Sequence, residues 1–352
     1  MSAHPIELEQ FLVARGLLRE GVSSRWTALN GGVSSDVWRV ESSAGSYCVK
    51  QALERLKVTA EWLVPRTRSS YEWAYLRFAA DHVPGSVPRP LAHDPNLSII
   101  AMEFLEPSEF PVWKQQLMDR QVDDATARSV GAMLGQLHGL SAHSPELAQK
   151  FDTLENFRAI RLDPYLLATA QRHPDRAGVL HLLAERTAAS RIALVHGDVS
   201  PKNILVDAKG PVLLDAECAW FGDPAFDLAF CLTHLLLKCL VHPDIAARYL
   251  SAFAALFQSY RPRINWEDPA LLEQRAASLL PGLLLARIDG KSPVDYLEAA
   301  AQEQVRTVAR SFLAQPPARL DELAQAWRDM IRRHAQPASD EQYPNAVSGQ
   351  LS

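Results

Sequence analysis

The sequence predicts an α+β fold in which a small, β-rich N-terminal part precedes a larger, mainly helical C-terminal part. A turn between two strands at 29–40 and the short β-favouring runs 46–50 and 99–105 are concentrated in the first third of the chain. Apolar residues then recur at helical spacing in 130–137 and 320–331. A chain of 352 residues has room for both parts and a large core.

The first two strands are joined by a turn of small residues. Gly31, Gly32, Ser34 and Ser35 lie in this turn, and residues this small let backbone N–H groups approach phosphate oxygens. A Gly-Gly turn is also common in hairpins that bind nothing. The turn alone therefore does not identify a phosphate site.

A helix is predicted at 69–78, where aromatic residues and alanine recur at helical spacing and Glu72 lies near the start. Ser69 and Glu72 have the spacing of a capping box, in which the glutamate satisfies backbone N–H groups at the helix N-terminus. Later in the chain, Asp123 or Asp124 can cap the helix that carries the 130–137 pattern.

Two short apolar runs in the middle of the chain predict an antiparallel hairpin. The runs 204–206 and 212–214 favour β-structure, and 207–210 is a turn-forming tetrad. The residue that enters the first strand of a hairpin lies beside the residue that leaves the second, so Asn203 and Asp215 are expected to converge. An amide oxygen and a carboxylate at one point suit Mg²⁺ that carries substrate phosphates.

Asp198 lies five residues before Asn203, in the loop that leads into the hairpin. A carboxylate there can orient a substrate hydroxyl and accept its proton, while metal ions neutralise the transferred group. An isolated Asp or Asn is more often a turn or cap residue. The ordered set, with Asp215, makes an ATP-dependent kinase the leading hypothesis.

Three motifs occur in order here: His-Gly-Asp-x-x-x-x-Asn at 196–203, Asp-x-Glu at 215–217 and Gly-Asp-Pro-Ala-Phe-Asp at 222–227. Together they resemble the aminoglycoside phosphotransferase and choline kinase superfamily, whose members are small-molecule kinases. The resemblance implies a two-lobed, protein-kinase-like α+β fold.

The same resemblance implies the limits of the lobes. A small, β-rich N-lobe that binds nucleotide would cover residues 1–105. A larger, mainly α-helical C-lobe with the catalytic loop and the acceptor site would cover 106–335. The polar residues 336–352 are predicted to form a disordered tail.

The resemblance also assigns roles in the catalytic loop. Asp198 is the expected catalytic base, and Asn203 and Asp215 are the expected Mg²⁺ ligands. Asp227 would brace the loop from the following helix. His196 would shape the loop and would not carry a proton.

In the N-lobe, Lys50 resembles the lysine that binds ATP phosphates in kinases. Glu72 would then be its ion-pair partner, which is the alternative to a helix cap, and both interpretations stay open. The segment that joins the lobes would bind adenine through backbone groups near Glu103, Phe104 and Leu105.

The segment 49–65 carries Val-Lys-Gln-Ala-Leu, Lys-Val and Glu-Trp in order, and is similar to the corresponding insert of methylthioribose kinases. Those enzymes also carry Asp-x-Glu. The glutamate, Glu217 here, is an expected auxiliary metal or substrate contact, although an ion pair with a neighbouring Arg or Lys accounts for it equally well. The chain departs from them in the catalytic loop, which reads Ser-Pro-Lys-Asn at 200–203.

Arg287 is the candidate substrate residue. The segment 284–291 partly matches an Arg-Arg-x-x-Gly sugar-binding segment of methylthioribose kinases, but Ala286 replaces one arginine. We expect Arg287 to point into the cleft toward Asp198 and to donate paired hydrogen bonds to acceptor oxygens. The alternative is a surface or salt-bridged arginine with Asp289 as its partner.

Composition limits the class of protein. A hydrophobic content of 47% and a charged content of 22% are ordinary for a soluble enzyme. A net charge of −5 provides no basic field for nucleic acid. The N-terminal residues show no secretory signal, and four cysteines without metal-site spacing favour reduced thiols in the cytoplasm.

One apolar run, 225–241, approaches the length of a membrane span. Asp227, His234 and Lys238 interrupt it, and charged residues are costly in a bilayer. We therefore predict a buried core helix and no membrane partner.

The predicted function is transfer of the ATP γ-phosphate, with Mg²⁺ as cofactor, to a hydroxyl of a methylthioribose-like sugar or a related alcohol. The enzymatic alternative is an aminoglycoside antibiotic phosphotransferase, which needs acidic residues on the C-lobe; Glu267-Asp268 is the nearest pair. The alternative from another class is a nucleotide-binding pseudokinase that regulates a partner and needs no base such as Asp198.

Overall fold

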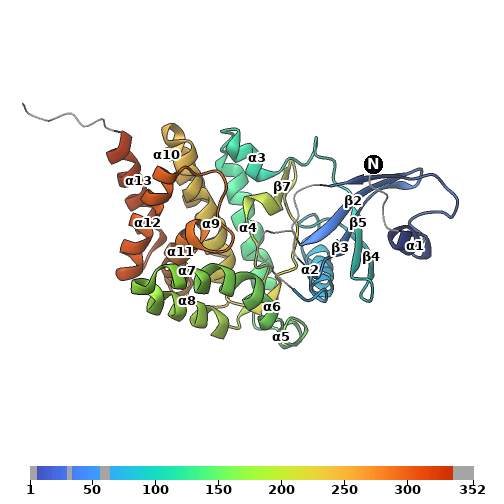
Figure 1. Cartoon of the computed structure of the whole chain (residues 1–352), viewed down its shortest axis with the longest axis horizontal. Coiled ribbons are helices and arrows are strands. Elements are labelled where there is room, and N and C mark those ends of the chain that lie inside the picture. The colour runs from blue at the N-terminus through green and yellow to red at the C-terminus, as the bar shows by residue number, and fades with distance from the viewer. Residues whose placement is uncertain (1–5, 30–33, 56–63, 336–352) are drawn as a thin grey trace, which may run out of the picture.

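The computed structural model describes residues 6–29, 34–55 and 64–335. Within them, an antiparallel five-stranded sheet occupies the N-terminal region and helices dominate the rest of the chain, which confirms the predicted α+β architecture. The sheet lies at one end of the molecule and helices α12 (Ala299–Ala314) and α13 (Leu320–Ala335) at the other (Figure 1). The β7–β8 hairpin, whose strand β7 (Ile204–Asp207) is labelled, lies between these two ends (Figure 1).

The five-stranded sheet has the order β1-β2-β3-β5-β4, with every neighbouring pair antiparallel. Its strands are β1 (Arg25–Ala28), β2 (Ser35–Ser42), β3 (Gly45–Ala52), β4 (Pro90–Asp94) and β5 (Ile99–Glu103). The central strand β3 continues two residues past Lys50, which was expected to end it. Lys50 is therefore paired on both sides, with Val37 of β2 and Ile100 of β5.

The two faces of the sheet pack against different helices. Helix α1 (Ile6–Ala14) buries Leu8, Phe11 and Leu12 in a small core with Val49 of β3. Because neighbouring side chains on a strand point to opposite faces, Lys50 points the other way, toward helix α2 (Arg68–His82). The sheet thus places this lysine between the strand layer and the helical part of the chain.

Two short antiparallel strand pairs carry the loops of the helical region. They are β6 (Ala193–Val195) with β9 (Trp220–Gly222), and β7 (Ile204–Asp207) with β8 (Gly210–Leu213). The β7–β8 pair is the hairpin that the two apolar runs predict. Its register joins Ile204 to Leu213.

Helices make up most of the remaining structure. The α-helices here, besides those already given, are α3 (Trp113–Met118), α4 (Asp124–Ser141), α5 (Pro145–Lys150), α6 (Leu154–Phe157), α7 (Ala168–Arg172), α8 (Ala177–Ala189), α9 (Pro224–Val241), α10 (Ala246–Tyr260) and α11 (Pro269–Asp289). Shorter or wider turns are the π-helix η1 (Arg158–Leu167) and the 3₁₀-helices η2 (Pro174–Arg176), η3 (Pro201–Asn203), η4 (Pro243–Ile245) and η5 (Arg261–Arg263). Asp123 caps α4 by accepting a 2.9 Å hydrogen bond from the N–H of Ala125, as expected.

Helix α9 runs through the middle of the helical region and packs against α10 and α11. Among the described residues, it is the one helix whose length and composition would allow it to cross a membrane, and 89% of its length is buried inside the protein. The prediction of a core helix is confirmed. Its polar residues Asp227, His234 and Lys238 are buried as well.

Helices α4 and α10 pack closely at Gly131. A Cβ atom at this position would lie 2.1 Å from the carbonyl oxygen of Leu256 in α10. We expect Gly131→Ala to lower the free energy of unfolding by about 1–3 kcal/mol, because backbone on the facing helix has to move. Urea unfolding followed by circular dichroism measures this change.

Gly178→Ala is the matched control for this prediction. Gly178 is also helical, in α8, but an added Cβ meets no described atom within 4 Å beyond its own helix. Its stability should stay unchanged or rise by up to about 1 kcal/mol, because alanine has less backbone entropy to lose. Equal losses in both variants would show that the α4–α10 contact is not tight.

Candidate active site

The loop that follows β6 is anchored from helix α9 by Asp227. Its carboxylate, which is fully buried, accepts 2.8 Å hydrogen bonds from the N–H groups of His196 and Gly197. Gly197 has φ +78°, and a Cβ there would lie 2.8 Å from the carbonyl oxygen of Cys218. The sequence His-Gly-Asp thus needs glycine in the middle both for its backbone conformation and for space.

His196 is held inside the loop by two hydrogen bonds. Its Nδ1 accepts from the N–H of Asp198 at 3.2 Å, so its Nε2 carries the proton and donates to the carbonyl oxygen of Leu214 at 3.1 Å. Burial lowers the pKa of His196 below its usual value. A neutral histidine that links two loop segments agrees with the expected shaping role.

Asp198 uses its two carboxylate oxygens differently. Oδ2 accepts from Nδ2 of Asn203 at 2.8 Å and lies 2.7 Å from Nη2 of Arg161 and 3.3 Å from Nζ of Lys202. Oδ1 is buried and has no hydrogen-bond partner among the described residues. The group is therefore held by one oxygen and presents the other, which can accept a hydrogen bond from a ligand.

Asn203 and Asp215 flank the open end of the β7–β8 hairpin, as its geometry predicts. The N–H of Leu214 donates to the carbonyl oxygen of Asn203 at 2.9 Å. Because the Asn203 amide nitrogen donates to Asp198, its amide oxygen is turned away from Asp198. Asp215 has φ +66°, in the left-handed region that Asp tolerates better than most residues.

Lys50 connects the sheet to both acids that face it. Its ammonium contacts Glu72 at 2.8 Å and also forms an ion pair with Asp215. Helix α2 begins at Arg68, and its N-cap, Thr67, makes no side-chain cap. Of the two interpretations of Glu72, the ion pair is the one present, and the Ser69 capping box is wrong because the helix starts before it.

The electrostatics of this cluster follow from burial and from the excess of acids. Burial alone would lower the pKa of Lys50, but Asp215, Glu72 and Glu217 together raise it well above the usual value. Asp215 is buried too, yet Lys50 and Lys202 hold the pKa of its carboxyl below the usual range. At neutral pH the cluster therefore contains a charged lysine and an ionised Asp215.

Glu217 pairs with Arg68, whose Nε donates to Oε2 at 3.0 Å. Arg68 is 1% exposed and also donates at 2.5 Å to the carbonyl oxygens of Ser34 and Leu53. The arginine thus joins the segment after β8 to the strand ends of the sheet. This is the ion-pair alternative for Glu217, and it engages one of its two carboxylate oxygens.

The oxygen atoms here suit a hard divalent cation. The amide oxygen of Asn203 and the carboxylate of Asp215 lie at one hairpin end, and Mg²⁺ is commonly held by one or two such groups together with substrate phosphates. No cluster of three or more His, Cys, Asp or Glu residues of metal-binding geometry occurs in 6–29, 34–55 or 64–335. A metal that arrives with phosphate ligands does not need such a cluster.

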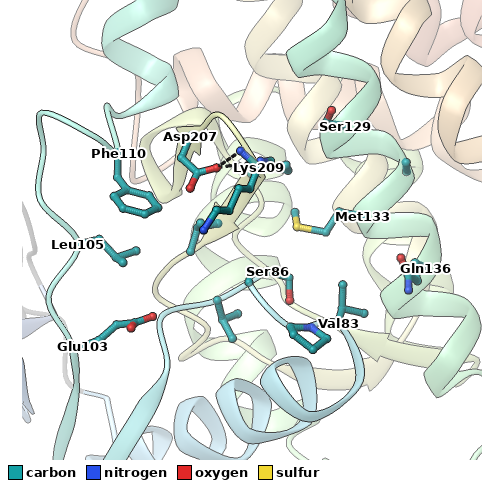
Figure 2. Close-up of a pocket in the computed structure, with 17 residues that line it drawn as sticks. Val83, Ser86, Glu103, Leu105, Phe110, Ser129, Met133, Gln136, Asp207 and Lys209 are labelled. Atoms are coloured by element: carbon teal, nitrogen blue, oxygen red, sulfur yellow. Dashed lines mark hydrogen bonds between the residues drawn. The ribbon is translucent and has the colours of Figure 1, made fainter.

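The side chains at the end of β5 and just after it have different neighbours. Phe104 lies under the Arg39 guanidinium, 4.4 Å from ring centroid to Cζ, and Arg39 also pairs with Glu106 at 2.6 Å. Glu103 and Leu105 line a cavity of about 510 Å³ on another side (Figure 2). No described residue accepts a hydrogen bond from the N–H of Leu105, so this backbone donor is free for a ligand.

The cavity in Figure 2 is separate from the Lys50 and Asp215 cluster, because neither residue lines it. It lies among the loop after α2, the segment after β5, helix α4 and the β7–β8 turn, where Asp207 accepts a hydrogen bond from the N–H of Lys209. Met133 and Gln136 of α4 face it (Figure 2). This cavity is thus not where the acidic and basic groups of the site converge.

Arg287 of α11 contacts Tyr165 and Ser292 and does not contact Asp198. Its Nη1 donates to the hydroxyl of Tyr165 at 3.3 Å and also bonds Ser292. Asp289 is not its partner, because that carboxylate pairs with His173 and Arg306. Arg287 instead lines a small cavity together with Lys202 and Lys238.

Some predicted residues cannot be placed. Gly31 and Gly32 of the small-residue turn lie outside the described residues, as do the Lys57 to Trp62 part of the methylthioribose-kinase-like insert and the tail 336–352. Ser34 and Ser35 are described and are buried at the start of β2.

Four basic residues at the site have no counterpart among the predicted site residues: Arg68, Arg161, Lys202 and Lys238. Lys202 stands inside the Ser-Pro-Lys-Asn motif, four residues after Asp198, so its position carried a signal. The position of Lys238 also carried a signal, because a cation is unusual in an apolar helix. Arg68 and Arg161 meet their acids 149 and 37 residues away in sequence, which no local pattern indicates.

Comparison with known proteins identifies the family. A model of the phosphotransferase enzyme family matches residues 25–264. The chain belongs to this family. Methylthioribose kinase of Geobacillus thermodenitrificans is 25% identical over 301 residues, covering 74% of this chain and 76% of that enzyme. Methylthioribose kinase 1 of Oryza sativa is 25% identical over 228 residues, covering 57% of this chain and 53% of that enzyme.

Solved structures share the fold of this phosphotransferase. An ethanolamine kinase of Plasmodium vivax has a TM-score of 0.54 and 12% identity, with 85% of each chain covered. An aminoglycoside phosphotransferase of Alicyclobacillus acidocaldarius has a TM-score of 0.51 and 17% identity, with 95% of this chain and 97% of that chain covered. The predicted superfamily and the protein-kinase-like fold are confirmed.

Proposed function

We propose that this phosphotransferase is an ATP-dependent kinase that transfers the γ-phosphate to a hydroxyl of a small molecule. The observation that carries the proposal is the arrangement around Asp198. One carboxylate oxygen is fixed by three donors, and the other is buried without a hydrogen-bond partner in the described part of the chain. A proton acceptor held in this way is suited to a hydroxyl group of the acceptor.

The residues have separate tasks in this mechanism. Lys50 binds phosphate oxygens of ATP, and Asn203 and Asp215 would hold Mg²⁺, with Glu217 as an auxiliary contact. Mg²⁺ neutralises charge on the phosphates. The acceptor oxygen forms a bond to the γ-phosphorus as the bond to the β-phosphate oxygen breaks, ADP leaves, and the hydroxyl proton passes to Oδ1 of Asp198.

In this proposal the nucleotide lies between the two lobes, 1–105 and 106–335. The free N–H of Leu105 supports adenine binding by backbone groups at 103–105. The phosphates then point toward Lys50. Backbone N–H groups of the small-residue segment with Gly31, Gly32, Ser34 and Ser35 are proposed to bind their oxygens. The four free cysteines fit a cytoplasmic location, where thiols stay reduced.

For the acceptor, relatives named methylthioribose kinases support a hydroxylated sugar or a related alcohol. An aminoglycoside has less support. Glu267, half of the acidic pair that such a polycation would need, is bound to Arg275 at 2.7 Å. Asp268, the other half, caps α11 through the N–H of Ala270. Both acids are thus engaged within the protein.

The proposed function is tested by measuring ADP release with Mg²⁺-ATP and one acceptor at a time, over methylthioribose, choline, homoserine and an aminoglycoside. We expect ADP release to require both Mg²⁺ and an acceptor hydroxyl. Nucleotide binding without phosphoryl transfer to any acceptor would instead favour a pseudokinase.

A further inference from the structure

A small cavity adjoins the loop that carries Asp198, and Pro201 and Lys202 of this loop line it. Its volume is about 40 Å³, which is space for about three water molecules or one small charged group. Lys202 lines it and lies 3.3 Å from Oδ2 of Asp198. An acceptor whose hydroxyl faces Asp198 would therefore extend toward this cavity.

The lining of the cavity is strongly cationic. Lys114, Lys202, Lys238 and Arg287 contribute four basic side chains from four different elements, and Asp295 contributes one acid. Asp295 lies 4.0 Å from Lys114 and its side chain is 86% exposed, so it is a weak counterion in high-dielectric surroundings. The positive charge of the cavity is not compensated by the described protein.

Lys238 is the most unusual of these residues. It is 1% exposed, in the last turn of the core helix α9, and its ammonium forms no hydrogen bond or ion pair with any described residue. The ammonium nitrogen lies 4.7 Å from the centroid of the Tyr296 ring. Burial, together with Lys114 and Arg287, lowers the pKa of Lys238 to about 7. Unpaired buried cations are costly, and natural proteins rarely keep them without a counterion.

Two further donors at the cavity are also unsatisfied. Nε of Arg287 and the hydroxyl of Tyr296 are buried and have no partner among residues 6–29, 34–55 and 64–335. Buried polar groups nearly always have a hydrogen-bond partner in the functional state. Three unpaired donors on residues that line one cavity indicate that its occupant is rich in acceptor oxygens.

We propose that the phosphoryl acceptor carries an anionic group, a phosphate monoester or a carboxylate, that binds in this cavity between Lys238, Arg287 and Lys202. The proposal rests on the proposed function for the fate of the acceptor hydroxyl, which would face Asp198. The anionic group supplies the missing counterion. A polycation such as an aminoglycoside would be repelled by the same four basic residues.

Isothermal titration with inorganic phosphate and with acetate tests this proposal. Mg²⁺ and ADP are kept at saturation, so that Lys50 and its surroundings are already occupied. Wild type should bind at least one of the two anions, and Lys238→Met should weaken that binding at least tenfold. Lys150→Met removes an exposed lysine from α5 and is the charge-matched control; it should bind like wild type.

The two anions separate the two chemical classes, since a preference for phosphate indicates a phosphorylated acceptor and a preference for acetate a carboxylated one. Thermal unfolding of Lys238→Met excludes a folding defect, because removal of an unpaired buried charge should leave the melting temperature unchanged or raise it. Binding that Lys238→Met retains in full, or the absence of anion binding to folded wild type, would overturn the proposal.

Failure of the proposed function has a different signature. ADP titration of the same wild-type sample, without any anion, measures nucleotide binding alone. A protein that binds no nucleotide but loses anion binding on Lys238→Met would keep the anion site and lose the kinase assignment. A protein that binds nucleotide and no anion would keep the kinase assignment and lose the anion site.

Discussion

Asp198→Asn should lower kcat by about 10²- to 10⁴-fold, the usual contribution of a positioned proton acceptor. Three donors converge on Oδ2, so the amide oxygen of an asparagine would occupy that position. Its NH₂ group would replace Oδ1, which can then no longer accept a proton. Steady-state ADP release with an identified acceptor measures the effect.

ATP affinity distinguishes this loss from a general defect. Asp198→Asn keeps the shape and the hydrogen bonds of the loop, so Kd for Mg²⁺-ATP should stay within a few-fold of wild type. Asp152→Asn, which changes an exposed ion pair with Arg191, should keep full activity. An unchanged kcat in Asp198→Asn would reject Asp198 as the base.

Asp215→Ala should weaken Mg²⁺-ATP binding by at least about tenfold, the lower end of what loss of a group supporting a metal site costs. The variant also removes one counterion of Lys50. ATP phosphates can then take its place beside the ammonium, so binding without Mg²⁺ should be unchanged or slightly tighter.

Calorimetric titration of ATP with and without Mg²⁺ checks both expectations. Wild type should show a large difference between the two conditions, and Asp215→Ala little difference. The sign of the change without Mg²⁺ matters, because a variant that merely unfolds would lose binding in both conditions. A Mg²⁺ effect as large as in wild type would remove Asp215 from the metal site.

Local patterns predicted the catalytic hairpin well. Two apolar runs and a turn tetrad determine β7 and β8, and strand pairing then brings Asn203 beside Leu214, one residue before Asp215. Helix α9 was predicted to be buried from its apolar content alone. Each of these inferences needs only residues that are close in sequence.

Contacts between distant segments were predicted less fully. The Lys50–Asp215 pair spans 165 residues, and resemblance to kinases suggested a site there but not the direct contact. Glu217 could pair with any nearby base, and the arginine that it meets enters from α2. Lys238 was visible as a charge in an apolar run, but its surroundings depend on how α3, α9 and α11 pack.

The two ion pairs of helix α2 restrict how the sheet can move. The ion pairs Lys50–Glu72 and Arg68–Glu217 are both buried. The first connects α2 to strand β3, whose Lys50 also pairs with Asp215, and the second connects α2 directly to Glu217. An outward swing of α2 would separate these pairs and leave charges unpaired in the interior.

Breaking one buried pair costs about 3–5 kcal/mol, which leaves well under about one molecule in a hundred with α2 displaced. Helix α2 is therefore expected to keep its position against the sheet before any ligand binds. In the proposed reaction, Lys50 and Asp215 still have to separate before Lys50 can bind phosphate oxygens and Asp215 can bind Mg²⁺. A ligand would then change this one ion pair and leave the helix in place.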